Sequence, residues 1–150
     1  MQKDAMKTDF KQMADLLIDL SFQDKDLETK TKYKNFHIKL EDASYKTRLG
    51  RYHMVTHVIE LSGMKKQCRK DILITYLHEL SHHIETIDSG TTGHGKPFYD
   101  IHIKLLKTAI DLEIIQLEDI TENKTSKAGN KNKLAKLMYG YKRKSISYTI

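Results

Sequence analysis

The first twenty residues carry apolar side chains at helical spacing. These side chains are separated by four and three positions: Met6, Phe10, Met13, Leu17 and Leu20. One apolar stripe of this kind predicts an amphipathic helix, which we expect to end near Ser21. Residues 22–32 are polar and charged and contain no glycine or proline, so they indicate only a connection between elements.

The pattern then changes to a period of two. Residues 36–40 (FHIKL) alternate between apolar and polar side chains, as a half-buried strand does. We expect a second strand over residues 45–49, with Gly50 marking a tight turn or bulge. Residues 51–61 are rich in β-branched and aromatic types and predict a third strand. Together these strands predict a small antiparallel sheet.

Helical spacing returns over residues 69–87. The apolar positions recur every three or four residues: Leu73, Leu77, Leu80, Ile84 and Ile87. Residues 88–95 are rich in glycine, serine and threonine and predict a loop. Pro97 suits the start of another helix, because its missing N–H would have no partner there. We expect that helix to continue to about Ile120.

The last thirty residues differ from the rest in charge. Residues 121–150 hold eight lysines and arginines and one acid, so of the net charge of +6 they carry +7 and residues 1–120 carry −1. Residues 121–133 resemble a solvated linker, and residues 134–150 predict a short helix and a docking strand. We therefore expect one domain over residues 1–120 and a basic extension over residues 121–150.

Length and composition limit the class of protein. The chain has 150 residues and a mass of 17.5 kDa. Hydrophobic residues make up 39% of the sequence, as in an ordinary globular domain. It has no apolar run of the roughly 18 residues that a membrane span needs. The charged N-terminus predicts no secretory signal. Cys68 is the single cysteine, so no internal disulfide can form, and we expect a cytoplasmic protein.

Residues 78–82 read H-E-L-S-H, an H-E-x-x-H motif within the predicted helix. Residues four apart on a helix point the same way, so His78 and His82 can bind one ion at about 2.0–2.1 Å. Glu79 follows the first ligand and lies beside the metal, where it can accept a proton from activated water. This arrangement predicts a catalytic metal site, and zinc is its usual ion.

A catalytic zinc takes three protein ligands and leaves one position open. His94, between Gly93 and Gly95, is the best third ligand, because small neighbours let the backbone approach closely.

Other residues compete with His94 for this role. Asp88 stands where the long zincin motif has its third ligand, but that motif needs a glycine where this chain has Glu85. His83 points about 100° away around the helix, which suggests a surface or supporting position. His102 and Glu113 lie farther along the chain, on the next predicted helix.

These motifs resemble the SprT-like zinc metallopeptidases. That family pairs an H-E-x-x-H helix with a downstream H-G-x-x-F, here residues 94–98, which supplies the third histidine. Residues 49–52 and 58–62 are similar to the hairpin that precedes the helix in this family, so the resemblance spans residues 36–112. Many SprT-like proteins also carry a C-terminal cysteine zinc ribbon, which a chain with Cys68 alone cannot form.

The resemblance implies a zincin-like α+β fold with an N-terminal helix, a small antiparallel sheet, an active-site helix, a second C-terminal helix and a basic tail. By position, His78, His82 and His94 would bind Zn²⁺, and Glu79 would be the general base. The substrate would be a peptide or protein, lying along the edge of the strand predicted at residues 51–61.

The residues leave two alternatives to a peptidase open. The first is a nucleic-acid-associated module with a structural zinc. The tyrosines of its basic tail, Tyr139, Tyr141 and Tyr148, suit stacking on bases, and the lysines suit DNA phosphates. They also suit docking of the tail onto the body. The second is a protein that binds peptides at a catalytically silent zinc site. We assign Cys68 no role beyond a helix start or loop.

Overall fold

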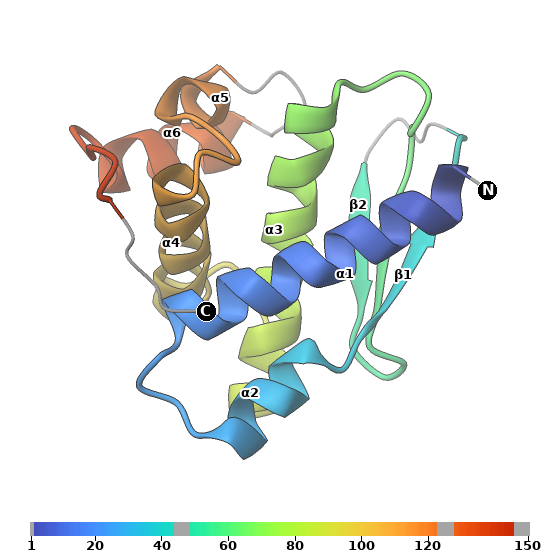
Figure 1. Ribbon diagram of the computed structural model, residues 1–150. Helices are drawn as coiled ribbons and strands as arrows, with labels where there is room; N and C mark the ends of the chain where they lie inside the picture. The colour runs from blue at the N-terminus through green and yellow to red at the C-terminus, as the bar shows by residue number, and fades with distance from the viewer. Residues whose placement is uncertain (1, 44–48, 123–127, 146–150) are drawn as a thin grey trace.

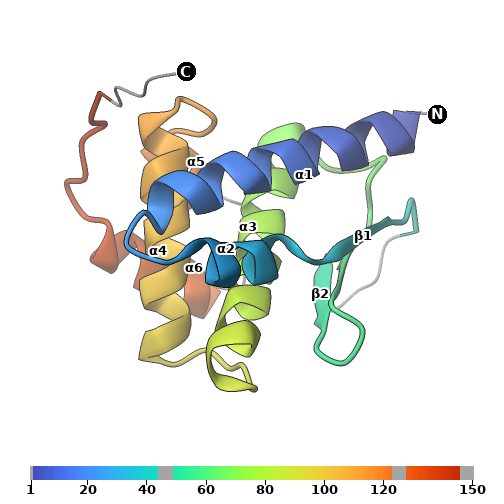
Figure 2. The ribbon, with the colours of Figure 1, turned by 60° about the horizontal axis from the view of Figure 1, so that its bottom comes forward.

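The computed structural model describes residues 2–43, 49–122 and 128–145. Over these residues the chain is α+β, with six helices and one three-stranded sheet, as the sequence predicts at this level (Figure 1). Helix α3 (Arg69–Ser89) runs through the middle. The sheet lies on one side of α3 and helix α4 (Lys96–Asp111) lies on the other (Figure 2). Among the described residues, no helix has the length and apolar character to cross a bilayer.

The N-terminal part contains one helix that the pattern predicts and one that it misses. Helix α1 (Gln2–Ser21) ends where its apolar stripe does, and it buries Phe10 and Leu17 completely. Helix α2 (Leu27–Lys34) stands where only a connection is expected. The Asp26 side chain caps it, accepting a hydrogen bond of 2.7 Å from the backbone N–H of Thr29. With one buried residue, α2 has no apolar stripe to reveal it.

The sheet differs from the prediction in two ways. Residues 51–61 do not form one strand: β2 (Gly50–His53) and β3 (Val58–Leu61) are the two arms of a hairpin. Its turn has no glycine, proline, asparagine or aspartate to announce it. His57 adopts a φ of 55° instead, a conformation uncommon outside glycine.

The sheet is also mixed rather than antiparallel. β1 (His37–Leu40) pairs with β3 in parallel, and the strand order is β1-β3-β2. Parallel neighbours require a crossover connection, and β2 lies within the one that joins β1 to β3. Alternation shows which faces are buried but not which strands are neighbours. The predicted strand at residues 45–49 lies, except for Leu49, outside the described residues.

The C-terminal third also departs from the predicted boundaries. Helix α4 ends at Asp111 rather than near Ile120, because Glu113 turns into the left-handed region with a φ of 62°. A short helix, α5 (Leu117–Thr121), follows. Helix α6 (Ala128–Leu137) occupies part of the expected linker. Its Leu134, with Met138 just after it, is buried in the core, so apolar contacts hold this segment to the body.

Candidate metal centre

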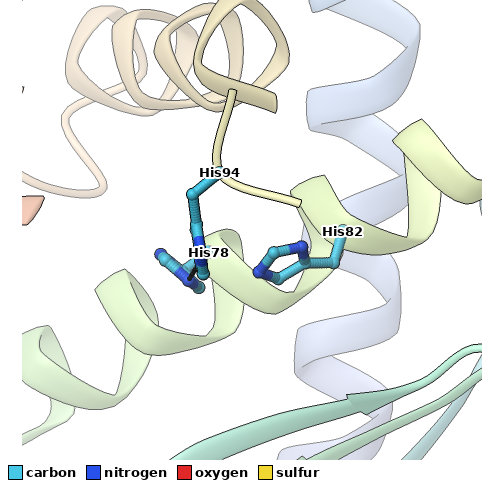
Figure 3. A group of neighbouring side chains, drawn as sticks. All are labelled: His78, His82 and His94. Carbon is cyan, nitrogen blue, oxygen red and sulfur yellow. Dashed lines mark hydrogen bonds between the residues drawn. The ribbon is translucent and has the colours of Figure 1, made fainter. Parts of the chain in front are cut away.

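The centre is built by α3 and the loop that follows it. His78 and His82 are one helical turn apart on α3. Gly90 ends that helix in the left-handed conformation, with a φ of 80°, and donates its backbone N–H to Thr86 O at 2.8 Å. The chain then doubles back, and His94 lies just before α4 begins. In Figure 3 the three rings point toward one another, two from the helix and one from the loop.

The distances between the three rings fit a bound metal ion. One nitrogen from each ring lies within 4.8 Å of the other two, and Nε2 of His78 is 3.2 Å from Nε2 of His94. Two nitrogens that each lie about 2.0–2.1 Å from a tetrahedral ion are about 3.3 Å apart. The separation of this pair is thus close to the one that a shared ion requires. These three histidines, all predicted from the sequence, could hold a metal.

Burial keeps the two helix histidines in the form that metals bind. It lowers the pKa of His78 to about 2, with smaller contributions from the neighbouring histidines, and the pKa of His82 to about 4. Both rings are therefore neutral near pH 7, and a neutral imidazole has one nitrogen with a free lone pair. His94 is exposed, so the centre is open to solvent on the loop side.

An apolar ring closes the other side of the centre. Phe98 is completely buried, and its ring centroid lies 4.9 Å from that of His78, 4.4 Å from that of His82 and 5.1 Å from that of His94. It supports all three rings at once. This contact gives a physical reason for the phenylalanine that follows the third histidine in the sequence.

Glu79 is buried beside the sheet. Only 6% of it is exposed, and burial raises the pKa of its carboxyl to about 8. Strand β2 approaches it closely at Gly50. A Cβ atom on Gly50 would lie 2.5 Å from Thr75 Cγ2 and 3.1 Å from Glu79 Oε2. Gly50 is therefore needed for close packing, not for the tight turn or bulge that the sequence suggests.

The competitors for the third ligand make other contacts. Asp88 lies inside α3, and its Oδ1 accepts a hydrogen bond of 2.6 Å from the Tyr33 hydroxyl. Glu113 is exposed and lies 3.5 Å from Arg143. His83 is completely buried in the core, so of the two positions expected for it, surface or supporting, the surface position is wrong. Cys68 is exposed and immediately precedes α3, as expected of a helix-start residue.

His102 comes nearest to the centre without joining it. Its ring centroid is 5.4 Å from that of His78, but it is not in the group whose nitrogens converge. It is 1% exposed, and neither ring nitrogen has a hydrogen-bond partner in the described structure. Burial lowers its pKa to about 3, so this ring is neutral as well.

Sequence reasoning missed two residues that support the centre. The Nδ1 atom of His82 lies 2.7 Å from the Thr92 hydroxyl, which donates to Glu85 Oε1 at 2.7 Å. The same carboxylate oxygen accepts the backbone N–H of Gly93 at 3.0 Å. No spacing rule links residues 85 and 92, because they meet only after Gly90 reverses the chain.

The basic tail is partly docked on the body. Tyr141 donates a hydrogen bond of 2.7 Å to Asp111 Oδ1, and the backbone N–H of Lys144 reaches the same atom at 2.8 Å. Tyr139, in contrast, is 91% exposed. Tyr148 lies outside the described residues.

Comparison with known proteins adds no relative: no family model, no curated protein and no solved structure matches the chain.

Proposed function

We propose that the protein is a zinc-dependent peptidase with a zincin-like fold, similar to the SprT-like enzymes. The observation that carries the proposal is the convergence of three imidazole nitrogens within 4.8 Å, beside a carboxylate buried on the same helix. His78, His82 and His94 are the proposed ligands. Nitrogen donors in this number leave one position open, as catalytic zinc sites do.

Zinc in such a site activates water at neutral pH and polarises the carbonyl of the scissile bond. Glu79 is the proposed general base: it accepts the proton of the attacking water and returns it to the leaving amine. Its raised pKa suits this role, because a base works best when its pKa lies near the operating pH. A nearby divalent cation favours the ionised carboxylate, which keeps Glu79 able to accept a proton.

Strand β2 is the proposed substrate platform. Among the described strands it lies at the edge of the sheet, paired with β3 on one side. An extended peptide can add to such an edge through main-chain hydrogen bonds. The contact between Gly50 and Glu79 places the start of this strand beside the proposed base, so a peptide bound along β2 would pass close to the reacting groups.

Glu79→Gln tests the mechanism. It keeps the shape of the side chain but removes its basicity, so hydrolysis of an unfolded protein substrate should fall by about 10²–10⁴-fold while zinc stays bound. Glu113→Gln is the matched control, because Glu113 is exposed and away from the centre. Unchanged hydrolysis by zinc-loaded Glu79→Gln would refute the proposed role of Glu79. Zinc binding without hydrolysis in the wild type would favour the peptide-binding alternative.

Metal content tests the ligand set independently of activity. The wild-type protein should hold about one zinc per chain, as a single three-histidine site requires. His94→Ala should lose it and Asp88→Ala should keep it. A wild-type protein that takes up no zinc after reconstitution would refute the metal centre.

A second candidate function rests on the exposed Tyr139 within the basic tail. An exposed aromatic ring among lysines can stack on bases while the lysines contact phosphates. If the tail binds DNA, the affinity should fall steeply as salt rises. A flat salt response, or no binding, would eliminate this candidate.

A further inference from the structure

The carboxylate of Glu85 is unusual in supporting two of the three proposed ligands. Glu85 is 8% exposed and lies one turn beyond His82 on α3. Its Oε1 atom accepts one hydrogen bond from the Thr92 hydroxyl and one from the backbone N–H of Gly93. Neither bond belongs to the regular backbone pattern of a helix or strand. Both therefore depend on the Glu85 side chain.

Counting hydrogens determines the tautomer of His82. The Thr92 hydroxyl has one hydrogen, and it donates that hydrogen to Glu85. Toward His82 Nδ1, at 2.7 Å, its oxygen can only accept. The proton of the neutral His82 ring is therefore on Nδ1. The lone pair is left on Nε2, the atom that faces away from Thr92.

The second bond acts on the loop. Gly93 precedes His94 directly, and its N–H is held by the carboxylate at 3.0 Å. This bond fixes the backbone at the point from which the His94 side chain starts. One buried carboxylate thus orients a ligand on the helix and anchors a ligand on the loop.

We propose that Glu85 and Thr92 are positioning residues that set the metal affinity of the centre. They hold His82 in the tautomer that presents Nε2, and they hold the His94 loop against α3. The inference rests on the metal site of the proposed function. Carboxylates that act through a metal-bound histidine typically change metal affinity by about 10–100-fold when removed.

The first test measures zinc affinity by competition with a chelator. Thr92→Val removes the hydroxyl at nearly constant shape and should weaken zinc binding by about 10–100-fold. Thr92→Ser restores the hydroxyl and should restore most of the affinity. Glu85→Gln keeps an oxygen acceptor but loses the charge, so it should fall between the two. Thr91→Val is the control, since Thr91 lies outside this hydrogen-bonded chain, and it should bind zinc as the wild type does.

The second test needs no metal. The ¹⁵N NMR signals of the histidine rings distinguish a protonated Nδ1 from a protonated Nε2. Metal-free wild type and Thr92→Ser should show His82 protonated on Nδ1, and Thr92→Val should show a mixture of both tautomers. A loop that was merely less stable would not change the tautomer.

The outcomes separate this inference from the proposed function. Wild-type zinc affinity in folded Thr92→Val, or a His82 ring protonated on Nε2 in the wild type, would overturn the positioning role and leave the metal centre intact. Failure of the wild type to bind zinc would overturn both.

Discussion

His82 and His83 are neighbours in the sequence, yet their rings have opposite roles. In the arrangement proposed above, His82 donates from Nδ1 to Thr92, which leaves the lone pair on Nε2 for the metal centre. His83 lies 3.3 Å from the Lys32 carbonyl through Nε2, which must donate, so its Nδ1 accepts the Tyr52 hydroxyl at 2.7 Å. The two rings thus carry their protons on different nitrogens. One keeps a lone pair free for an ion, and the other uses both nitrogens within the core.

The difference comes from the faces of α3. Successive residues of a helix point about 100° apart, so His83 shares a row with Glu79 and Thr75, four and eight residues earlier. This row packs against β2, through Gly50 and Tyr52. The row of His78 and His82 faces the loop of His94 instead. A histidine on α3 therefore lines the proposed metal centre or supports the core according to what lies opposite it.

Replacing His82 and His83 in turn should show the difference between the two faces most clearly. His82→Ala removes a proposed ligand, so zinc affinity should fall by more than about 100-fold, beyond the loss expected for a supporting residue. His83→Ala leaves a cavity and removes the hydrogen bond to the Tyr52 hydroxyl, so the free energy of unfolding should fall by about 2–4 kcal/mol. Chelator competition and urea denaturation measure the two effects. Similar zinc loss in both variants would show that the faces are not separate.

Acidification should lower the free energy of unfolding of the metal-free protein, through histidines on both faces of α3. Three buried histidines and one partly buried histidine have lowered pKa values, so below pH 6.5 the unfolded chain binds protons that the folded chain does not. They are His82, His83 and His102, and the partly buried His78. Each such proton lowers the free energy of unfolding by about 1.4 kcal/mol per pH unit. Glu79 opposes one of them, because its raised pKa makes the folded chain hold a proton that the unfolded chain releases above pH 4.5.

The net slope between about pH 4.5 and 6.5 is therefore up to about 4 kcal/mol per pH unit, with stability lost as the pH falls. Urea denaturation at pH 6.5 and pH 5.5, without zinc, measures it. His83→Phe should reduce the slope by one proton, or about 1.4 kcal/mol per pH unit, and leave the contributions of the other three histidines and of Glu79. A stability that does not change over this range would contradict the neutral, buried state of these rings.

Gly50→Ala tests the packing of β2 on the core face. Its new Cβ would collide with Thr75, a short branched side chain that cannot swing away, so the free energy of unfolding should fall by about 1–3 kcal/mol. Gly93→Ala is the matched control on the loop, because nothing lies within 4 Å of its Cβ position. Thermal or urea denaturation compares them. Equal stability of the two variants would disprove the close approach of strand and helix.

His102→Leu should change the free energy of unfolding least, and it should raise it rather than lower it. It removes a buried ring whose two nitrogens lack partners in the described structure, so unfolding should cost about 1 kcal/mol more. Zinc affinity should stay as in the wild type, because His102 is outside the converging group. A marked loss of zinc affinity would place this ring within the centre after all.

Elements with a strong hydrophobic periodicity could be predicted from the sequence, and elements without such a periodicity could not. The stripe of α1 and the spacing of His78 and His82 on α3 are local patterns, and both helices lie where these patterns place them. Helix α2 has no such stripe. The end of α4 depends on Glu113 adopting a positive φ, which no pattern announces. The strand order is equally invisible, since alternation does not identify the neighbour of a strand.

By itself, the sequence determined that two histidines and a glutamate lie within about one turn of the same helix, because a period of 3.6 residues orients side chains without outside help. It also offered His94 as a candidate. Only the tertiary structure decided that His94 joins the pair while His102 and Asp88 do not, and that Glu85 and Thr92 orient His82. The reason is physical: a helix repeats its geometry locally, whereas a ligand or support from another segment depends on where the chain turns and what it packs against.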